Sequence, residues 1–196
     1  MYGTRTLAAM VADLRTMLTR AGVRGPYVLV AHSYGGLILR LFAQTYPEDA
    51  AGLVLVDAFG THIKPLFGDQ WASYQAILNY PGTVLDTMPG FETVDADEAI
   101  AAVEQGRALP RIPVAVISKT EPFAISPTVP EALRTQLEKV WPEVQERLVD
   151  LGPQAPHIFA TGSDHYVQIR DPDLVVRIIR LVFERARALE HRRRSS

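Results

Sequence analysis

Residues 27–36 read YVLVAHSYGG, and this segment sets the architecture that we expect for the chain. The first five residues are apolar and rich in β-branched side chains without alternation, which favours a strand buried on both faces of a parallel sheet. Apolar residues at helical spacing resume at Leu37. Ser33 therefore stands on a sharp strand-to-helix turn, and its hydroxyl is expected above the carboxyl edge of the sheet.

The residues around Ser33 fit a nucleophile on such a turn. Ala31 and Gly35 are small, as expected if the tight turn brings both positions against neighbouring backbone. The following helix would point its free N–H groups at the same place, so that the backbone N–H of Tyr34 could stabilise an oxyanion. The alternative is that the small residues only pack a tight turn.

Strands and helices alternate along the rest of the chain, which predicts an α/β fold with a mostly parallel sheet and flanking helices. Apolar runs predict further strands at 53–56, 114–117 and 157–160. Apolar residues at helical spacing predict helices at 7–18, 37–46, 71–78, 95–109, 133–148 and 174–189. Pro142 would be a kink or a boundary between two helices. We interpret 1–196 as a single domain, with 58–110 as a small helical, cap-like insertion.

The composition is that of an ordinary soluble protein, since 47% of the 196 residues are hydrophobic and the formal net charge is −2. No apolar run is long enough to span a membrane, and the near-neutral charge gives no general attraction to nucleic acid. The arginines at 192–194 are interpreted as part of a frayed terminus. The lack of cysteine excludes disulfides, thiolate metal sites and cysteine nucleophiles. We expect no cofactor and no metal site, and by default a cytoplasmic location, because residues 1–24 lack the pattern of a signal peptide.

A serine nucleophile needs a base, and one of the five histidines is well placed to act as one. His165 follows the last predicted strand on a Gly-Ser-Asp turn, from which a loop at the carboxyl edge of the sheet can place the imidazole over Ser33. His32 adjoins the serine, so its side chain is expected to point elsewhere. His157 begins a strand and is expected to pack.

The base in turn needs a carboxylate that orients it. Asp57 ends the strand that follows the serine's helix, and the ends of neighbouring parallel strands meet at one edge of the sheet. Glu121, four residues past the third predicted strand, is the competing candidate. Asp57 could instead cap the following turn, and Glu121 could be a surface loop charge. Strand-end geometry favours Asp57 as the acid.

Three segments of the chain resemble the α/β-hydrolase superfamily. Residues 25–36 look like its fifth strand and nucleophile elbow, residues 46–58 like the end of the next helix and the sixth strand, and residues 162–175 like the histidine loop and last helix. The order serine, acid, histidine also fits the superfamily. Ala31 stands where glycine is usual. The loop after the third predicted strand lacks the aspartate that many members use, whereas other members place the acid after strand six, at the position of Asp57.

The usual fold of this superfamily has four strands before the nucleophile strand, whereas here only a helix precedes it. The His-Gly type motif that normally supplies the second oxyanion donor is absent as well. The resemblance therefore implies the C-terminal half of an α/β-hydrolase sheet, apparently lacking the N-terminal strands, with half of the oxyanion hole. The strand at 27–31 would then have an open apolar edge, which predicts either a homodimer through this edge or poor solubility.

These features together predict a serine hydrolase that cleaves a carboxylic ester of a small or medium apolar substrate, an esterase-like enzyme of EC class 3.1. Ser33 would attack the ester, His165 would transfer the proton and Asp57 would orient His165. One alternative is an N-terminally truncated, catalytically silent domain, and another is an acyltransferase or lyase that shares the triad. A nucleotide-binding domain is disfavoured because the chain has no glycine-rich phosphate loop.

Aromatic residues gather in the predicted insertion, at Phe67, Trp71, Tyr74, Tyr80 and Phe91. They would line an apolar pocket for the acyl or alcohol group, or they would pack the insertion onto the sheet. The sequence favours neither reading over the other.

Overall fold

The computed structural model describes residues 5–79 and 92–195. Its four strands form one parallel sheet, in the order in which they occur along the chain: β1 (Tyr27–His32), β2 (Ala50–Val56), β3 (Val114–Lys119) and β4 (His157–Ala160). The apolar runs predicted each of these strands, and their parallel pairing is confirmed. β2 and β3 are buried along nearly their whole length, which explains why their sequences do not alternate.

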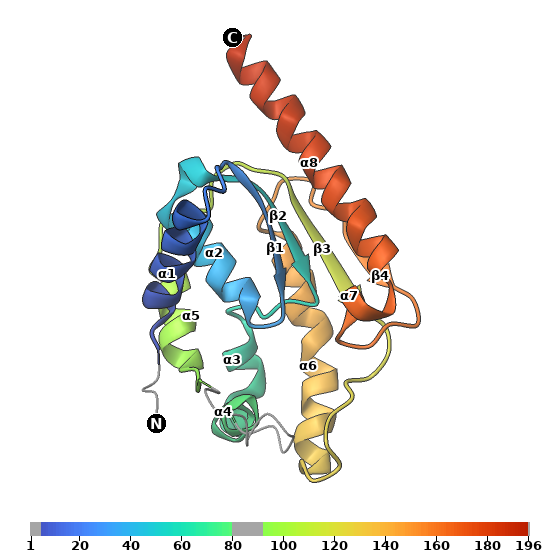
Figure 1. Cartoon of the computed structure of the whole chain (residues 1–196). Helices are drawn as coiled ribbons and strands as arrows, with labels where there is room; N and C mark the ends of the chain where they lie inside the picture. Colours follow the sequence, from blue (N-terminus) through green and yellow to red (C-terminus); the bar gives the residue numbers. More distant parts are fainter. Residues whose placement is uncertain (1–4, 80–91, 196) are drawn as a thin grey trace.

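Helices connect the strands and cover both faces of the sheet (Figure 1). Before β3 they are α1 (Leu7–Arg20), α2 (Gly35–Thr45), α3 (Ile63–Phe67), α4 (Trp71–Asn79) and α5 (Ala96–Glu104). After β3 they are α6 (Glu131–Val149), α7 (Val167–Arg170) and α8 (Pro172–Arg194). α2 and α6 are the crossovers of two parallel strand pairs, which is the arrangement that the alternating sequence pattern predicts.

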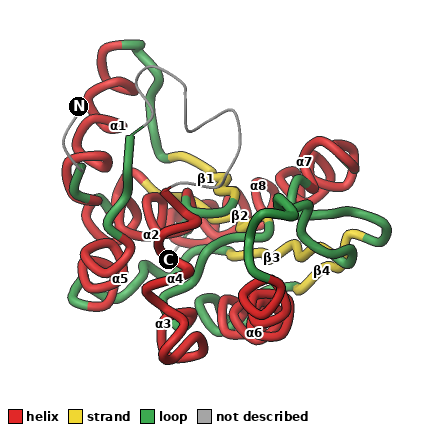
Figure 2. The backbone as a smooth tube through the Cα atoms, turned by 90° about the horizontal axis from the view of Figure 1, so that it is seen from below, coloured by secondary structure: helices red, strands yellow, loops and turns green. Residues whose placement is uncertain are grey.

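The two faces of the sheet have different covers. α2 lies against β1 and β2, α6 lies against β3, and the larger apolar core is on this face. α8 crosses β1, β2 and β3 on the other face over a smaller core, and Figure 2 shows α6 and α7 on opposite sides of β3 and β4. Gly52 of β2 permits the close packing of α8, because a Cβ there would lie 2.5 Å from Cγ1 of Val182.

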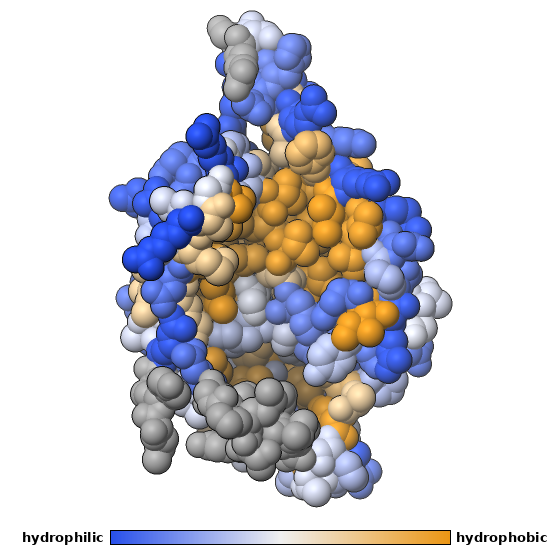
Figure 3. Space-filling view, in the orientation of Figure 1, coloured by the Kyte–Doolittle hydropathy of each residue, from blue (hydrophilic) through white to orange (hydrophobic). Residues whose placement is uncertain are grey.

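β1 is the edge strand of the described sheet, and the face that it turns towards α8 is only partly covered. Leu29 and Ala31 are buried in the larger core, whereas Val30 on the opposite face is 40% exposed. Figure 3 shows the apolar surface that results over β1 and β2, beside α8. A groove of about 360 Å³ extends from this surface to the start of the strand, between Val28 and Phe183. Within the described residues, the open edge expected at 27–31 is therefore present.

Several elements differ from the sequence-based expectations. α6 runs through Pro142 as one helix, so this proline is not the boundary between two helices that was one of the two expectations, because the missing N–H removes only one hydrogen bond of a long helix. α5 ends before Gly106, shorter than predicted. α8 continues to Arg194 where a frayed terminus was expected, because Arg, Ala, Leu and Glu in its last turns are strong helix formers. The short helices α3 and α7 were not predicted.

Two further expectations concern membrane spans and the insertion. No helix within the described part of the chain combines the length and the apolar character needed to cross a membrane. The insertion predicted at 58–110 is described except for residues 80–91. Tyr80 and Phe91 of the predicted aromatic set therefore lie outside the described residues.

Candidate active site

Ser33 lies at the carboxyl end of β1, on the turn into α2, where the sequence places it. Its backbone is left-handed, with φ of 52°, a conformation that costs roughly 1–2 kcal/mol for a residue with a Cβ. Two N–H groups hold the turn, because Gly36 N at 2.9 Å and Phe59 N at 2.8 Å both donate to the carbonyl oxygen of Ser33. The strained turn is thus tied both to the start of α2 and to the segment after β2.

The close approach at this turn occurs at Gly36 and not at Gly35, where the motif placed it. A Cβ on Gly36 would lie 2.9 Å from Cβ of Ala58 and 2.9 Å from the carbonyl oxygen of Phe59. A Cβ on Gly35 would meet Cβ of Ala31 at 4.0 Å, which is an ordinary contact. The start of α2 therefore meets the segment after β2 one residue later than expected.

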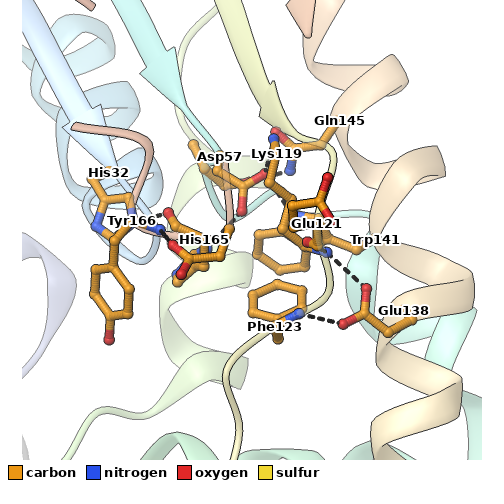
Figure 4. Close-up of polar contacts among 12 residues, drawn as sticks. His32, Asp57, Lys119, Glu121, Phe123, Glu138, Trp141, Gln145, His165 and Tyr166 are labelled. Carbon is orange, nitrogen blue, oxygen red and sulfur yellow. Dashed lines mark hydrogen bonds and ion pairs between the residues drawn. The ribbon is translucent and has the colours of Figure 1, made fainter. Parts of the chain in front are cut away.

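His165 and Asp57 form a hydrogen-bonded pair at the carboxyl edge of the sheet (Figure 4). Nδ1 of His165 lies 2.6 Å from Oδ2 of Asp57. Because a carboxylate only accepts, Nδ1 carries the proton, and in the neutral ring Nε2 is the basic nitrogen. Glu121, the competing candidate, is exposed and accepts from the Thr120 hydroxyl at 3.3 Å. Within the described residues no hydrogen bond joins Glu121 to His165.

Asp57 is fully buried and accepts hydrogen bonds from three segments. Besides the bond from His165 to Oδ2, its Oδ1 accepts from the backbone N–H of Lys119 at 3.1 Å and from Nε1 of Trp141 at 2.9 Å. A buried carboxylate is tolerated when donors surround it in this way. Its backbone is also left-handed, with φ of 42°, which an aspartate adopts more readily than most residues.

The structure brings Ser33 to the same edge as this pair without a direct hydrogen bond. Within the described residues, none joins the hydroxyl of Ser33 to Nε2 of His165. The ring of His32, the residue before the serine, contacts the histidine loop: its centroid lies 4.5 Å from that of His165. Within the described residues no hydrogen bond joins this ring to the Ser33 hydroxyl.

Aromatic residues that the sequence pattern does not reveal surround His165. Phe123 and Trp141 lie 4.8 Å and 5.7 Å from its ring centroid. Phe123 is held in turn by Glu138, whose Oε1 accepts from the Phe123 backbone N–H at 2.5 Å. Trp141 lies on the apolar face of a predicted helix, and that pattern predicts packing without indicating that its N–H meets Asp57.

The described aromatic residues of the insertion pack against one another. Phe67, Trp71 and Tyr74 are buried, and Tyr74 stacks on Phe67 with a centroid distance of 4.3 Å. Nε1 of Trp71 donates to the carboxylate of Asp97 at 2.9 Å. For these three residues the structure favours the packing role. His157 packs as expected, and its Nε2 is 2.7 Å from the hydroxyl of Ser118.

Comparisons with known proteins agree with this architecture. A family model described as the alpha/beta hydrolase fold matches residues 2–112. A probable transporter from Hormonema carpetanum is 25% identical over 231 residues, which cover 95% of this chain and 33% of that protein. An uncharacterized protein of Bacillus subtilis is 27% identical over 177 residues, covering 87% of this chain and 62% of that protein. The chain thus spans about a third of the first relative and less than two thirds of the second.

Solved structures show the same fold. A probable hydrolytic enzyme from Pseudomonas aeruginosa aligns with a TM-score of 0.60 at 20% identity, over 91% of this chain and 69% of that one. A thermophilic esterase from Thermogutta terrifontis aligns with a TM-score of 0.56 at 21% identity, over 95% of this chain and 75% of that one. The family model covers more than half of the 196 residues, and the parallel sheet agrees with it. The chain therefore belongs to the α/β-hydrolase fold family.

Proposed function

We propose that the chain is a serine hydrolase that cleaves a carboxylic ester of a small or medium apolar substrate. The observation that carries the proposal is the 2.6 Å hydrogen bond between Nδ1 of His165 and Oδ2 of the buried Asp57. It leaves Nε2 as the basic nitrogen, at the edge of the sheet where Ser33 stands on a left-handed turn. The rings of Phe123 and Tyr166 lie 4.8 Å and 5.5 Å from that of His165, and they favour an apolar acyl or alcohol group.

The reaction would follow two steps. In the first, the hydroxyl of Ser33 gives its proton to Nε2 of His165 while Oγ forms a bond to the ester carbon. The bond to the alcohol oxygen then breaks, and the alcohol leaves with the proton from His165. In the second, His165 takes a proton from water, the water oxygen attacks the acyl carbon, and the proton returns to Oγ of Ser33 as the carboxylic acid leaves. Asp57 keeps Nδ1 protonated and stabilises the imidazolium in both steps.

The negative oxygen formed in each step needs hydrogen-bond donors. The backbone N–H of Tyr34, the residue after the nucleophile, is the donor that this turn supplies. A missing oxyanion donor lowers the rate about 100- to 1000-fold. We therefore expect a slow hydrolase if Tyr34 N–H acts alone.

Labelling with a fluorophosphonate probe tests the proposal, because such probes react with an activated serine. We expect mass spectrometry to place the label on Ser33 in the folded protein and to find none on a Ser33→Ala variant. Hydrolysis of short-chain nitrophenyl esters by the wild type and not by Ser33→Ala would assign the ester reaction. Folded wild-type protein that takes up no probe would refute the proposal.

A catalytically silent domain is the second candidate function, and the partly covered β1 favours it. This edge strand has a valine at position 30 that is 40% exposed. A silent domain would bind no probe at Ser33 yet unfold cooperatively. An acyltransferase or a lyase would instead be labelled at Ser33. The acyltransferase would turn over esters faster when an acyl acceptor is added, and the lyase would not turn over esters at all.

We also propose that two copies of the chain pair through β1. An edge strand is a template for another strand when it has an apolar face and one row of unpaired backbone groups. If two copies pair antiparallel through this edge, the backbone groups of both edges form hydrogen bonds at once. Sedimentation at tens of micromolar should give a dimer for the wild type. Val30→Lys, which places a charge on the 40% exposed valine, should give a monomer. A wild type that sediments as a stable monomer would rule out the pairing.

A further inference from the structure

Apart from His165, one side chain donates a hydrogen bond to the carboxylate of Asp57 among the described residues, and it is Trp141 of α6. Nε1 of Trp141 lies 2.9 Å from Oδ1, with the tryptophan 2% exposed and the aspartate fully buried. The other donor to Oδ1 is the backbone N–H of Lys119, which a substitution does not remove. Because each hydrogen bond to a buried charge is costly to lose, the indole N–H and the Lys119 N–H together fix the position of Oδ1.

The same indole also contacts the imidazole of His165. The two ring centroids are 5.7 Å apart with an interplanar angle of 83°, which is an edge-to-face arrangement. Phe123 closes the remaining space, with its ring 5.0 Å from that of Trp141 and 4.8 Å from that of His165. Trp141 therefore touches both members of the Asp57–His165 pair, one through a hydrogen bond and the other through its ring.

One face of α6 keeps Trp141 in this place (Figure 4). Glu138, three positions earlier, pairs with Nζ of the nearly buried Lys119 at 2.7 Å. Gln145, four positions later, donates from Nε2 to the carbonyl oxygen of Ala58 at 2.8 Å. Residues at this spacing share one side of a helix. The helix is thus bound, on both sides of the indole, to the two segments that adjoin the buried carboxylate.

We propose that Trp141 is a positioning residue, whose indole N–H fixes the Asp57 carboxylate and through it the imidazole of His165. The kinetic part of this proposal rests on the serine-hydrolase function proposed above. The N–H also offsets part of the carboxylate's charge. Its removal would leave more negative charge facing His165 and would favour the protonated imidazole. A loss of packing alone would not have this second effect.

Trp141→Phe tests the proposal, and the chain offers Trp71→Phe as a matched control. Trp71 is also buried, and its Nε1 also lies 2.9 Å from a carboxylate oxygen, that of Asp97 in the insertion. Each change removes one N–H that bonds a carboxylate and keeps an aromatic ring. The two variants therefore differ in which carboxylate loses an indole donor: the buried Asp57, or the half-exposed Asp97, which keeps its bonds to Lys64 and Gln75.

We expect Trp141→Phe to slow the labelling of Ser33 roughly 10-fold per folded molecule. The acid limb of its pH–rate profile should move to higher pH by roughly a few tenths of a unit. The low-field proton NMR signal of the His165 Nδ1–H, in its hydrogen bond to Asp57, should shift as well. Trp71→Phe should leave the labelling rate per folded molecule, the acid limb and the NMR signal unchanged.

The NMR signal separates this proposal from the hydrolase function. If wild-type Ser33 is not labelled but the signal shifts in Trp141→Phe alone, the hydrolase function fails and the positioning of the Asp57–His165 pair is supported. If Trp141→Phe changes neither the acid limb nor the signal, and labelling falls only with the folded fraction, Trp141 is a packing residue. That result, or an equal shift in Trp71→Phe, would overturn the proposal.

Discussion

Nε2 of His32 lies 2.8 Å from the main-chain oxygen of His165. Because a carbonyl oxygen only accepts, Nε2 of His32 carries a proton and donates it to this bond. Burial, and next the nearby His165, lower the pKa of His32 below its usual range. The residue before Ser33 thus ties the turn to the histidine loop, and its lowered pKa favours the neutral ring. A neutral neighbour adds no positive charge that would oppose the protonation of His165 during a reaction.

We predict that the protein becomes less stable as the pH falls, in part because of His32. In the unfolded chain an imidazole binds a proton near pH 6.5, about its usual pKa, whereas burial lowers the pKa of His32 in the folded state. Between the two values the unfolded state binds more protons, so the free energy of unfolding decreases as the pH falls below about 6.5. His32→Gln, which keeps an N–H donor of similar reach, should make this decrease smaller.

Urea unfolding measured between about pH 7.5 and about pH 5 checks the prediction. His62→Gln is the control, because the side chain of His62 is exposed. The decrease should persist in part in His32→Gln, since burial lowers the pKa of His157 too. Equal decreases in the wild type, His62→Gln and His32→Gln would show that His32 contributes nothing to the pH dependence.

Substitution of the two carboxylate candidates should give very different rates. Asp57→Asn removes the charge that faces Nδ1 of His165, 2.6 Å away, and allows the wrong tautomer of the ring. We expect the labelling of Ser33 to slow about 1000- to 10,000-fold. Glu121→Gln changes an exposed carboxylate whose one hydrogen bond within the described residues comes from the neighbouring Thr120 hydroxyl, so the rate should stay within about twofold of the wild type.

The labelling rate is compared per folded molecule, with near-UV circular dichroism as the check that each variant is folded. A large loss of labelling rate in Glu121→Gln, with little loss in Asp57→Asn, would assign the role of the acid to Glu121. Equal small losses in both variants would mean that neither carboxylate assists the serine.

The strands, and the places of Ser33 and Asp57 at their ends, follow from local patterns, which is why the sequence predicted them. The apolar runs of β2 and β3 are buried on both faces and cannot be mistaken for amphipathic segments. The ends of parallel strands meet at one edge of the sheet, so the sequence predicts that Ser33 and Asp57 both lie at that edge. Neither inference needs a contact between distant side chains.

The sequence could not predict what surrounds the carboxylate of Asp57, because these contacts join segments that are far apart in the chain. Trp141 and Asp57 are 84 positions apart, and the indole N–H finds its acceptor only once α6 has docked on the sheet. The sequence pattern reports the apolar side of that helix without revealing what each side chain meets. The sequence likewise did not reveal what the His32 ring contacts, because its partner is a backbone oxygen in a loop 133 positions away.

The contrast between Gly36 and Gly35 gives a last prediction, on how the turn at Ser33 is held. A Cβ on Gly36 would lie 2.9 Å from both Cβ of Ala58 and the carbonyl oxygen of Phe59. Gly36→Ala should therefore push α2 away from the segment after β2 and stretch the two hydrogen bonds to the Ser33 carbonyl, 2.9 Å and 2.8 Å long. We expect a loss of about 1–3 kcal/mol in the free energy of unfolding and slower labelling of Ser33.

Gly35→Ala is the matched control, because it adds the same methyl group one position earlier. Its Cβ would have ordinary contact at 4.0 Å, and α2 begins at this residue. Alanine stabilises a helix by up to about 1 kcal/mol relative to glycine, so the variant should be as stable as the wild type or slightly more so, with its labelling rate unchanged. Urea unfolding and probe labelling of both variants provide the comparison. A larger loss of stability and labelling in Gly35→Ala than in Gly36→Ala would contradict the prediction. It would mean that the small residue is needed at position 35 itself, and that the packing of α2 against the segment after β2 does not hold the turn.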